Sequence, residues 1–289
     1  MSAIAATIEA TARPEAYDAP YHIGAVMLRA RDLPRLTAFY RDAIGLKLLS
    51  EGEGHAELGV EGQPLVRLVA GATERSAATG LFHLAILLPS RRDLADWLKH
   101  AAQTGIRLEG ASDHLVSEAL YLSDPEGNGI EIYRDRTRAE WPRRPDGGIA
   151  MATDRLDLDR LLGEAQSGPY AGMPAGTGMG HIHLRVGDTV AAEGFYRDLL
   201  GLDLMVRYPG ASFLSSGGYH HHIAGNIWGS RGAGARRPGE AGLDRFELVA
   251  RDESDFAAMR ERILANGGSE ADGAPTIADP WGNRLALVR

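Results

Sequence analysis

Histidine is the residue type best suited to chemistry in this chain, which has ten histidines and no cysteine. Three are consecutive, His220-His221-His222, and two more, His181 and His183, are spaced as neighbours on one face of a strand. Without cysteine, a disulfide framework, a thiolate metal site and a cysteine nucleophile are all excluded. Imidazole is both a common metal ligand and an acid–base group near neutral pH. The pattern therefore indicates metal-dependent or acid–base chemistry.

Alternation along predicted strands indicates which polar side chains face a cavity, because residues i and i+2 of a strand share one face. In three short segments, apolar residues alternate with polar ones. The polar residues that we expect to face inward are His83, Glu131, His181 and His183. The apolar residues that we expect to pack away from the cavity are Phe82, Leu84, Ile86, Ile130, Ile132, Ile182, Leu184 and Val186.

The consecutive histidines lie in a segment, 219–228, that we expect to form one strand. One face of it would carry Tyr219, His221, Ile223 and Ile227, and the other His220, His222, Ala224 and Asn226. We assign the second face to the cavity. His222 is then the first candidate for an acid–base group or a fourth metal ligand, and His220 is the second.

An internal duplication sets the architecture. Two motifs return at almost the same offset, 156 and 155 positions later. The first copies are Phe39-Tyr40-Arg41-Asp42 with Gly45-Leu46, and Asp124-Pro125-Glu126-Gly127-Asn128. The second copies are Phe195-Tyr196-Arg197-Asp198 with Gly201-Leu202, and Asp279-Pro280-Trp281-Gly282-Asn283.

Hydrophobic periodicity divides each half into two modules of one strand, one helix and three strands, βαβββ. We predict a first half at 20–135, with modules 20–72 and 80–135, and a second half at 178–289, with modules 178–229 and 241–289. The expected helices are 33–45, 91–104, 189–200 and 253–265. Residues 136–177, with several prolines and glycines, are predicted to be a connector with one short helix near 157–165.

Four βαβββ modules and these two repeated motifs resemble the glyoxalase/bleomycin-resistance/extradiol-dioxygenase superfamily, also called the vicinal oxygen chelate superfamily. The segment 110–125 and the run 219–223 are similar to members described as catechol 2,3-dioxygenases. The resemblance implies an α+β fold in which pairs of modules form half-open barrels of mixed sheet, with metal ligands on the first and last strands of the modules. Tyr121 and His114 resemble residues of extradiol enzymes that hydrogen-bond the oxygenated intermediate or a ligand.

The ligand positions implied by the resemblance are complementary in the two halves. The second module offers His83 and Glu131, and the third offers His181 with His222 nearby. The first and fourth modules offer residues that cannot bind a metal, because alanine has no donor atom and arginine stays protonated. These residues are Ala25, Arg67, Arg245 and Ala286. We therefore predict that modules two and three share a barrel, either within one chain or across the subunits of a homodimer.

Two histidines and one carboxylate with open positions suit Fe(II) that binds both substrate and dioxygen, although Mn, Co, Ni or Zn would also bind. The activity implied is extradiol cleavage of a catechol-like aromatic diol by O₂, with His183 in the substrate site. A glyoxalase-type isomerase or lyase that uses nickel or zinc is one alternative. A non-enzymatic protein that binds small molecules is the other.

The net charge of −8 argues against nucleic-acid binding, which depends on basic surfaces. No apolar run approaches the roughly 18 residues that a membrane span needs. Residues 1–20 lack the basic and apolar regions of a secretory signal, so we read them as a lead-in and predict a cytoplasmic protein.

Overall fold

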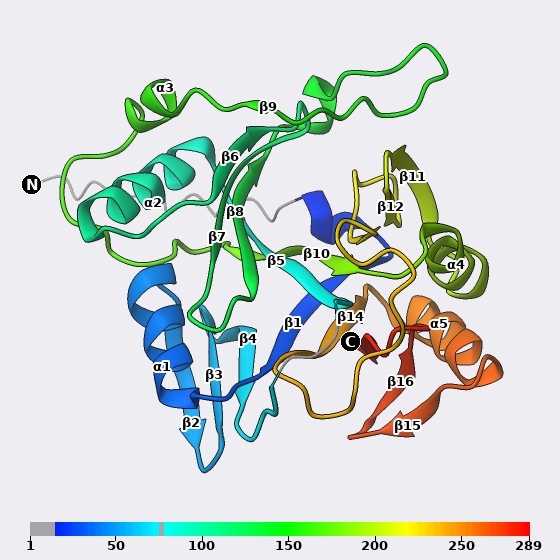
Figure 1. Ribbon diagram of the computed structural model, residues 1–289. Helices are drawn as coiled ribbons and strands as arrows, with labels where there is room; N and C mark the ends of the chain where they lie inside the picture. The colour runs from blue at the N-terminus through cyan, green and yellow to red at the C-terminus, as the bar shows by residue number, and fades with distance from the viewer. Residues whose placement is uncertain (1–14, 75–77) are drawn as a thin grey trace, which may run out of the picture.

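The computed structural model describes residues 15–74 and 78–289, so most of the predicted lead-in lies outside the described residues. Its strands form two curled sheets (Figure 1). The strands of the eight-stranded sheet are β1 (Tyr21–Arg29), β2 (Lys47–Gly52), β3 (His55–Val60), β4 (Gln63–Val69), β14 (Gly242–Ala250), β15 (Ser269–Ala271), β16 (Ala274–Ala278) and β17 (Arg284–Val288). Those of the nine-stranded sheet are β5 (Gly80–Leu88), β6 (Gly110–Asp113), β7 (Ser117–Ser123), β8 (Gly129–Asp135), β9 (Asp154–Arg155), β10 (Gly178–Arg185), β11 (Asp203–Tyr208), β12 (Ala211–Ser215) and β13 (Ile223–Asn226).

Helices occur where the periodicity predicts them. The α-helices are α1 (Leu33–Ala38), α2 (Arg91–Thr104), α3 (Leu158–Leu162), α4 (Thr189–Glu193) and α5 (Glu253–Ala265). The shorter helical segments are η1 (Glu15–Asp18), η2 (Phe39–Ile44), η3 (Arg138–Glu140) and η4 (Gly194–Leu199). The longest, α2, begins after Ser90, whose side chain accepts a hydrogen bond from the Asp93 amide, and ends at Gly105 in the left-handed conformation.

The order of elements confirms the α+β fold and the four βαβββ modules. The nine-stranded sheet has the order β11-β12-β13-β10-β5-β8-β7-β6-β9, and the eight-stranded sheet has the order β15-β16-β17-β14-β1-β4-β3-β2. Modules two and three thus share one sheet through the antiparallel pair β5 and β10, and modules one and four share the other through β1 and β14. The predicted pairing of modules two and three is confirmed within a single chain.

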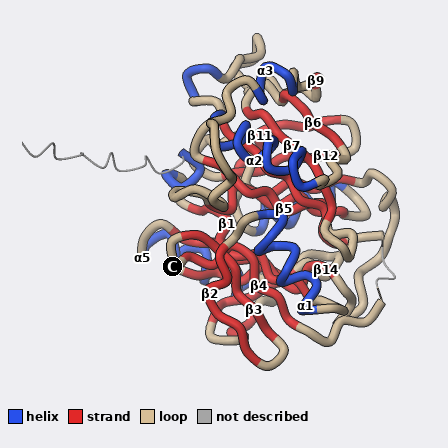
Figure 2. The backbone as a smooth tube through the Cα atoms, turned by 90° about the vertical axis from the view of Figure 1, so that its left-hand side faces the viewer, coloured by secondary structure: helices blue, strands red, loops and turns tan. Residues whose placement is uncertain are grey.

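The two sheets lie one above the other, and β1 contacts β10 where they meet. Figure 2 shows β6, β7 and β12 in the upper part of the molecule and β2, β3 and β4 in the lower part. Each long helix packs against strands of its own module: α2 against β5 and β8, and α5 against β14, β16 and β17. The second and fourth modules therefore each bury one face of their own helix.

The repeated motifs contact each other, and their role is structural. Tyr40 donates a hydrogen bond to Asp124 at 3.2 Å, and Tyr196 donates one to Asp279 at 3.0 Å in the second half. Asp124 also accepts hydrogen bonds from the backbone and side-chain amides of Asn128. A buried carboxylate needs such partners. The motif pair thus joins the two modules of each half, although those modules belong to different sheets.

The segment predicted as a connector does more than join the halves. It contains the expected short helix as α3, and β9 extends the nine-stranded sheet by pairing with β6. Within the described ranges, no helix combines the length and the apolar character that crossing a membrane requires.

Candidate metal centre

Three adjacent strands of the nine-stranded sheet place the candidate ligands. His181 on β10 is paired with Ala85 on β5, and Ala85 is paired with Glu131 on β8. Paired residues point to the same face, so His181 and Glu131 flank the small Ala85 side chain. His83 lies two residues before Ala85 on the same strand and shares that face. The space left above Ala85 is where the three side chains meet.

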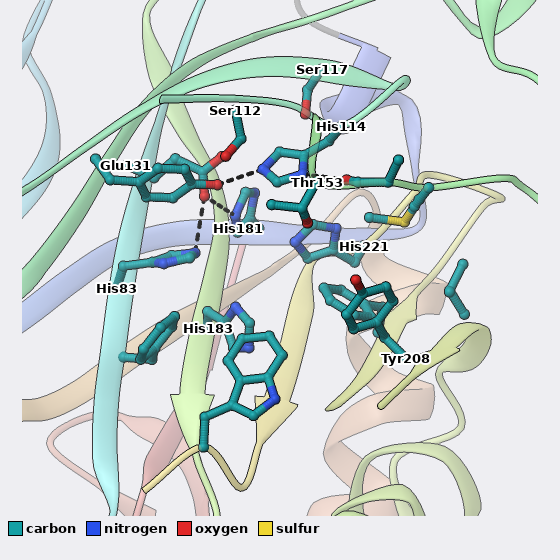
Figure 3. A pocket seen from close by; sticks show the side chains of 17 residues that line it. His83, Ser112, His114, Ser117, Glu131, Thr153, His181, His183, Tyr208 and His221 are labelled. Carbon is teal, nitrogen blue, oxygen red and sulfur yellow. Dashed lines mark hydrogen bonds and ion pairs between the residues drawn. The ribbon is translucent and has the colours of Figure 1, made fainter. Parts of the chain in front are cut away.

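The donor atoms of this trio converge in a buried position (Figure 3). Glu131 Oε2 lies 3.0 Å from His83 Nε2 and 3.1 Å from His181 Nε2. All three donor atoms lie within 4.8 Å of one another, and Glu131 and His181 are each only 2% exposed. The structure therefore brings together the three residues predicted as metal ligands.

The protonation states of this group suit a cation. Burial by itself would raise the pKa of Glu131, but its interactions with the neighbouring His181 and His83 outweigh this and hold that pKa well below its usual value. Burial lowers the pKa of His181 to about 4, although Glu131 opposes this. The group thus presents a carboxylate and a neutral imidazole, which are the ligand-competent forms.

The same atoms pass a simple test of fit to a metal ion. His83 Nε2 is buried with no hydrogen-bond partner of acceptable geometry, even though Glu131 lies close by. A buried nitrogen of this kind is costly unless its lone pair is used. Two imidazole nitrogens and one carboxylate oxygen on one side of a cavity match the donor set of non-haem iron and related divalent metals.

The trio forms one wall of a cavity of about 170 Å³. An apolar cavity of about 150 Å³ is large enough to hold benzene, so this one accommodates a single aromatic ring. The side chains around it come from modules two and three and from the connector. They are Phe82, His83, Ser112, His114, Ser117, Tyr121, Glu131, Met151, Ala152, Thr153, His181, His183, Val206, Tyr208, Phe213, His221 and Trp228.

His114 and Tyr121, singled out from the resemblance, form a hydrogen-bonded pair at this cavity. His114 Nδ1 lies 2.7 Å from the Ala152 carbonyl, which can only accept, so Nδ1 carries the hydrogen. In the neutral ring, Nε2 then accepts from the Tyr121 hydroxyl at 2.6 Å. Burial, followed by the charge of Glu131, raises the pKa of Tyr121 well above its usual value. Tyr121 is therefore a protonated donor whose direction is set by the connector.

His183 also lines the cavity, as expected from its strand position. Its Nε2 accepts a hydrogen bond from the Asn226 side-chain amide at 3.0 Å. Burial lowers the pKa of His183 well below its usual value, and His83 and His181 add to this effect. His183 is thus a neutral ring on the cavity wall beside Phe82 and Trp228.

The face assignment of the consecutive histidines was wrong. His222 points away from the cavity, where its Nδ1 lies 2.9 Å from Ser215 Oγ and its Nε2 lies 3.0 Å from the Ala16 carbonyl. His220 pairs with Asp135 at 2.8 Å. His221 is the member of the run that lines the cavity, with its ring 4.1 Å from that of His181. The cause is that β13 begins only at Ile223, so the two-residue alternation does not extend back through the histidines.

Phe82 was expected to pack away from the cavity, but it lines it. The pairing of β5 with β10 shifts beside it, from His183 with His83 to Leu184 with Leu81. Such an irregularity redirects a side chain. Alternation cannot reveal a shift of this kind, and no pattern in the sequence pointed to Met151, Ala152 and Thr153 of the connector. Tyr208 and Phe213 lie in β11 and β12, inside the predicted third module, where strand alternation is a signal that could indicate them.

The family model of the Glyoxalase/Bleomycin resistance protein/Dioxygenase superfamily matches residues 22–132 and 178–287, and the chain belongs to this superfamily. The chain is 40% identical over 268 residues to a protein of Bacillus subtilis (strain 168) named catechol-2,3-dioxygenase, covering 90% of this chain and 94% of that protein. A solved structure of a putative dioxygenase from Bacillus subtilis subsp. subtilis str. 168 superposes with a TM-score of 0.63 at 14% identity, covering 92% of this chain and 85% of that one. Glyoxalase I from Zea mays superposes with a TM-score of 0.56 at 18% identity, covering 95% and 94%. The two structural matches show the shared fold.

Proposed function

We propose that this protein is an Fe(II)-dependent extradiol dioxygenase that cleaves the ring of a catechol-like diol. The observation that carries the proposal is the convergence of His83, Glu131 and His181 on a cavity that accommodates one aromatic ring. The relative from Bacillus subtilis named catechol-2,3-dioxygenase supports it, because the alignment covers nearly the whole of both chains.

In this proposal His83, Glu131 and His181 hold the metal. Iron(II), when bound there, supplies neighbouring coordination positions for the two oxygens of a diol and for dioxygen. The aromatic side chains of Phe82, Phe213 and Trp228 line the same cavity and would pack against the substrate ring and exclude water. Such packing would orient the ring with its two oxygens toward His83, Glu131 and His181.

His221 is the residue placed to move a proton. Burial lowers its pKa well below its usual value, so the ring is neutral and its unprotonated nitrogen can accept. A diol hydroxyl would lose its hydrogen to Nε2 of His221 and could later recover it from the same atom. The Tyr121 hydroxyl, whose hydrogen is directed to His114, would present its oxygen as an acceptor for a substrate hydroxyl.

The alternatives receive less support from the cavity. A glyoxalase-type site would be favoured by a second carboxylate, whereas Glu131 is the only carboxylate among the described residues that line the cavity. A protein that only binds small molecules has no need for three converging donor atoms. We therefore retain neither as a second candidate.

The test is production of the protein under anaerobic conditions, measurement of its metal content, and exposure to catechol with isotopically labelled dioxygen. We expect iron near one equivalent and incorporation of both labelled oxygen atoms into a ring-opened product. Protein that holds iron but consumes no oxygen with catechol or its alkyl- and aryl-substituted forms would exclude the proposal. Turnover of an α-ketoaldehyde thiol adduct without oxygen would instead support the glyoxalase-type alternative.

A further inference from the structure

A buried chain of hydrogen bonds lies behind the cavity, and His221 is its one member with a role in the function proposed above. It starts at His221, whose Nδ1 lies 2.7 Å from His220 Nδ1. It continues from His220 Nε2 to Asp135 Oδ1 at 2.8 Å. Asp135 Oδ2 in turn accepts from the Tyr219 hydroxyl at 2.8 Å. His220 is fully buried, so these contacts are its polar environment among the described residues.

The direction of each hydrogen bond follows from the acceptor at the far end. The Asp135 carboxylate can only accept, so His220 Nε2 carries the hydrogen. In a neutral His220 ring, Nδ1 then has no hydrogen and must accept from His221 Nδ1. With its hydrogen on Nδ1, neutral His221 has an unprotonated Nε2. Nε2 is the ring nitrogen that no hydrogen bond within the described part of the chain occupies, and the His221 ring lines the cavity (Figure 3).

Packing fixes the rings in this arrangement. The His220 ring lies 4.0 Å from that of Tyr219 and 5.4 Å from that of Trp141, which comes from the connector. His221 is held between His181, at 4.1 Å, and Phe213, at 4.9 Å. Neither ring can turn over without breaking a buried contact. The hydrogen-bond chain is therefore preorganised before any substrate enters.

We propose that Asp135 and His220 are positioning residues that hold His221 in one orientation and one tautomer, with Nε2 unprotonated toward the cavity. The proposal rests on the proposed function for its consequence, since that function needs His221 Nε2 as an acceptor. It also explains why consecutive histidines occur here. His221 lines the cavity, and His220 connects it by hydrogen bonds to the Asp135 carboxylate. The logic is that of any histidine whose second nitrogen is fixed by a carboxylate.

The first test measures the tautomer directly and needs no turnover. Protein labelled with ¹⁵N-histidine and loaded with Zn²⁺, a diamagnetic ion, is examined by two-dimensional NMR that correlates ring nitrogens and carbons. We expect His221 to show a protonated Nδ1 and an unprotonated Nε2. A hydrogen on Nε2 in the wild-type protein would overturn the proposal, whether or not the iron form cleaves catechols.

The second test uses two variants that break the chain at different places. Asp135→Leu removes the acceptor for His220 Nε2, and His220→Phe removes the acceptor for His221 Nδ1 while keeping a ring between Tyr219 and Trp141. In both, we expect the His221 hydrogen to redistribute toward Nε2, and kcat to fall by roughly 10 to 10²-fold with metal content and KM unchanged. Asp135→Glu, which restores an acceptor, should recover part of the loss.

The matched control is Tyr133→Phe. The Tyr133 hydroxyl lies 2.9 Å from that of Tyr219 and belongs to the same buried network, but it is outside the path from Asp135 to His221. We expect the His221 tautomer and the kcat of this variant to match those of the wild type. The proposal fails if Tyr133→Phe loses as much activity as Asp135→Leu. It also fails if Asp135→Leu keeps the wild-type His221 tautomer and kcat, because the hydrogen bonds from Asp135 to His221 would then have only a structural role. An iron-loaded wild-type protein that is inactive, yet shows the expected tautomer, would instead disprove the function alone.

Discussion

The two sheets have the same strand order, but only the nine-stranded sheet carries residues that can bind a metal at the corresponding positions of its inner face. Strand β14 pairs with β17 in the same parallel register as β5 pairs with β8. Positions in the two sheets can therefore be compared one by one. Where the nine-stranded sheet has His83, Glu131 and His181, the eight-stranded sheet has Arg245, Ala286 and Ala25. Conversely, Ala85 in the first corresponds to Glu247 in the second. Each inner face thus holds a carboxylate near this position, on Glu131 of β8 in one sheet and on Glu247 of β14 in the other.

The two sheets differ in the residues that contact the carboxylates of Glu247 and Glu131. Glu247 forms an ion pair with Arg67, which also contacts Glu57 at 2.8 Å. The amide of Ala25 donates to Glu247 at 3.1 Å. Glu131 instead faces two imidazoles, of which His181 is neutral. An inward carboxylate needs positive charge nearby, and a permanently charged arginine supplies it in one sheet. In the other sheet no arginine among the described residues forms an ion pair with Glu131, and a metal cation would supply that charge.

Removing each carboxylate should give the largest contrast between the sheets. We expect Glu131→Ala to weaken metal binding by more than about 10²-fold, because even loss of a residue that only supports a ligand costs 10- to 100-fold. Ring cleavage should disappear with the metal, while the circular dichroism spectrum stays unchanged. The control, Glu247→Ala, should keep its metal. Stoichiometric iron in Glu131→Ala would show that this residue is not a ligand.

Within the nine-stranded sheet, the histidine run provides the next contrast. His221→Phe should retain iron and lose about 10²- to 10⁴-fold in turnover, as expected for removal of a general acid–base group. His222→Phe should keep its turnover per bound iron, although Ser215 and the Ala16 carbonyl lose a buried partner. Steady-state kinetics on iron-quantified samples distinguish the two. Equal losses in both variants would contradict the placement of the two rings.

In the eight-stranded sheet, the expected effect is on stability alone. Arg67→Ala should lower the free energy of unfolding by about 1–3 kcal/mol, because Glu247 is left largely buried without its cation. The double variant with Glu247→Ala should lose less than the sum of the single variants. Urea denaturation measures both, and metal content should stay at the wild-type value. Loss of metal in Arg67→Ala would mean that the sheets are coupled more tightly than their separate polar groups suggest.

Acid should destabilise the histidine-rich sheet gradually as the pH falls. Burial lowers the pKa of His222 to about 3, below the value near 6.5 in an unfolded chain. The unfolded state therefore takes up this proton first as the pH falls. His222 contributes its full stability above about pH 6.5, and that contribution decreases by up to about 1.4 kcal/mol per pH unit as the pH falls toward 3. Denaturation of His222→Gln between about pH 7 and 5 should show a shallower decline than the wild type, and equal slopes would contradict this.

Much of the fold could be predicted from the sequence because it depends on local periodicity. The four long helical segments and the module order appear as expected, and the complementary half-sites correctly paired the second module with the third. The candidate ligands were found by alternation in β5, β8 and β10, which are regular strands over those residues. Alternation failed at His220–His222 and at Phe82, where the chain leaves the regular strand or its pairing shifts.

The sequence by itself determined the types of chemistry available and the elements that carry them. It excluded thiolates, placed His83, Glu131 and His181 on inward faces, and marked the duplication. Tertiary structure alone decided which histidine of the run reaches the cavity, and that Asp135 and the connector support it. Those contacts join residues about 85 positions apart, as with Asp135 and His220. The physical reason is that period-two patterning reports only a residue's own strand, whereas a cavity wall is set by how strands and loops from distant segments pack together.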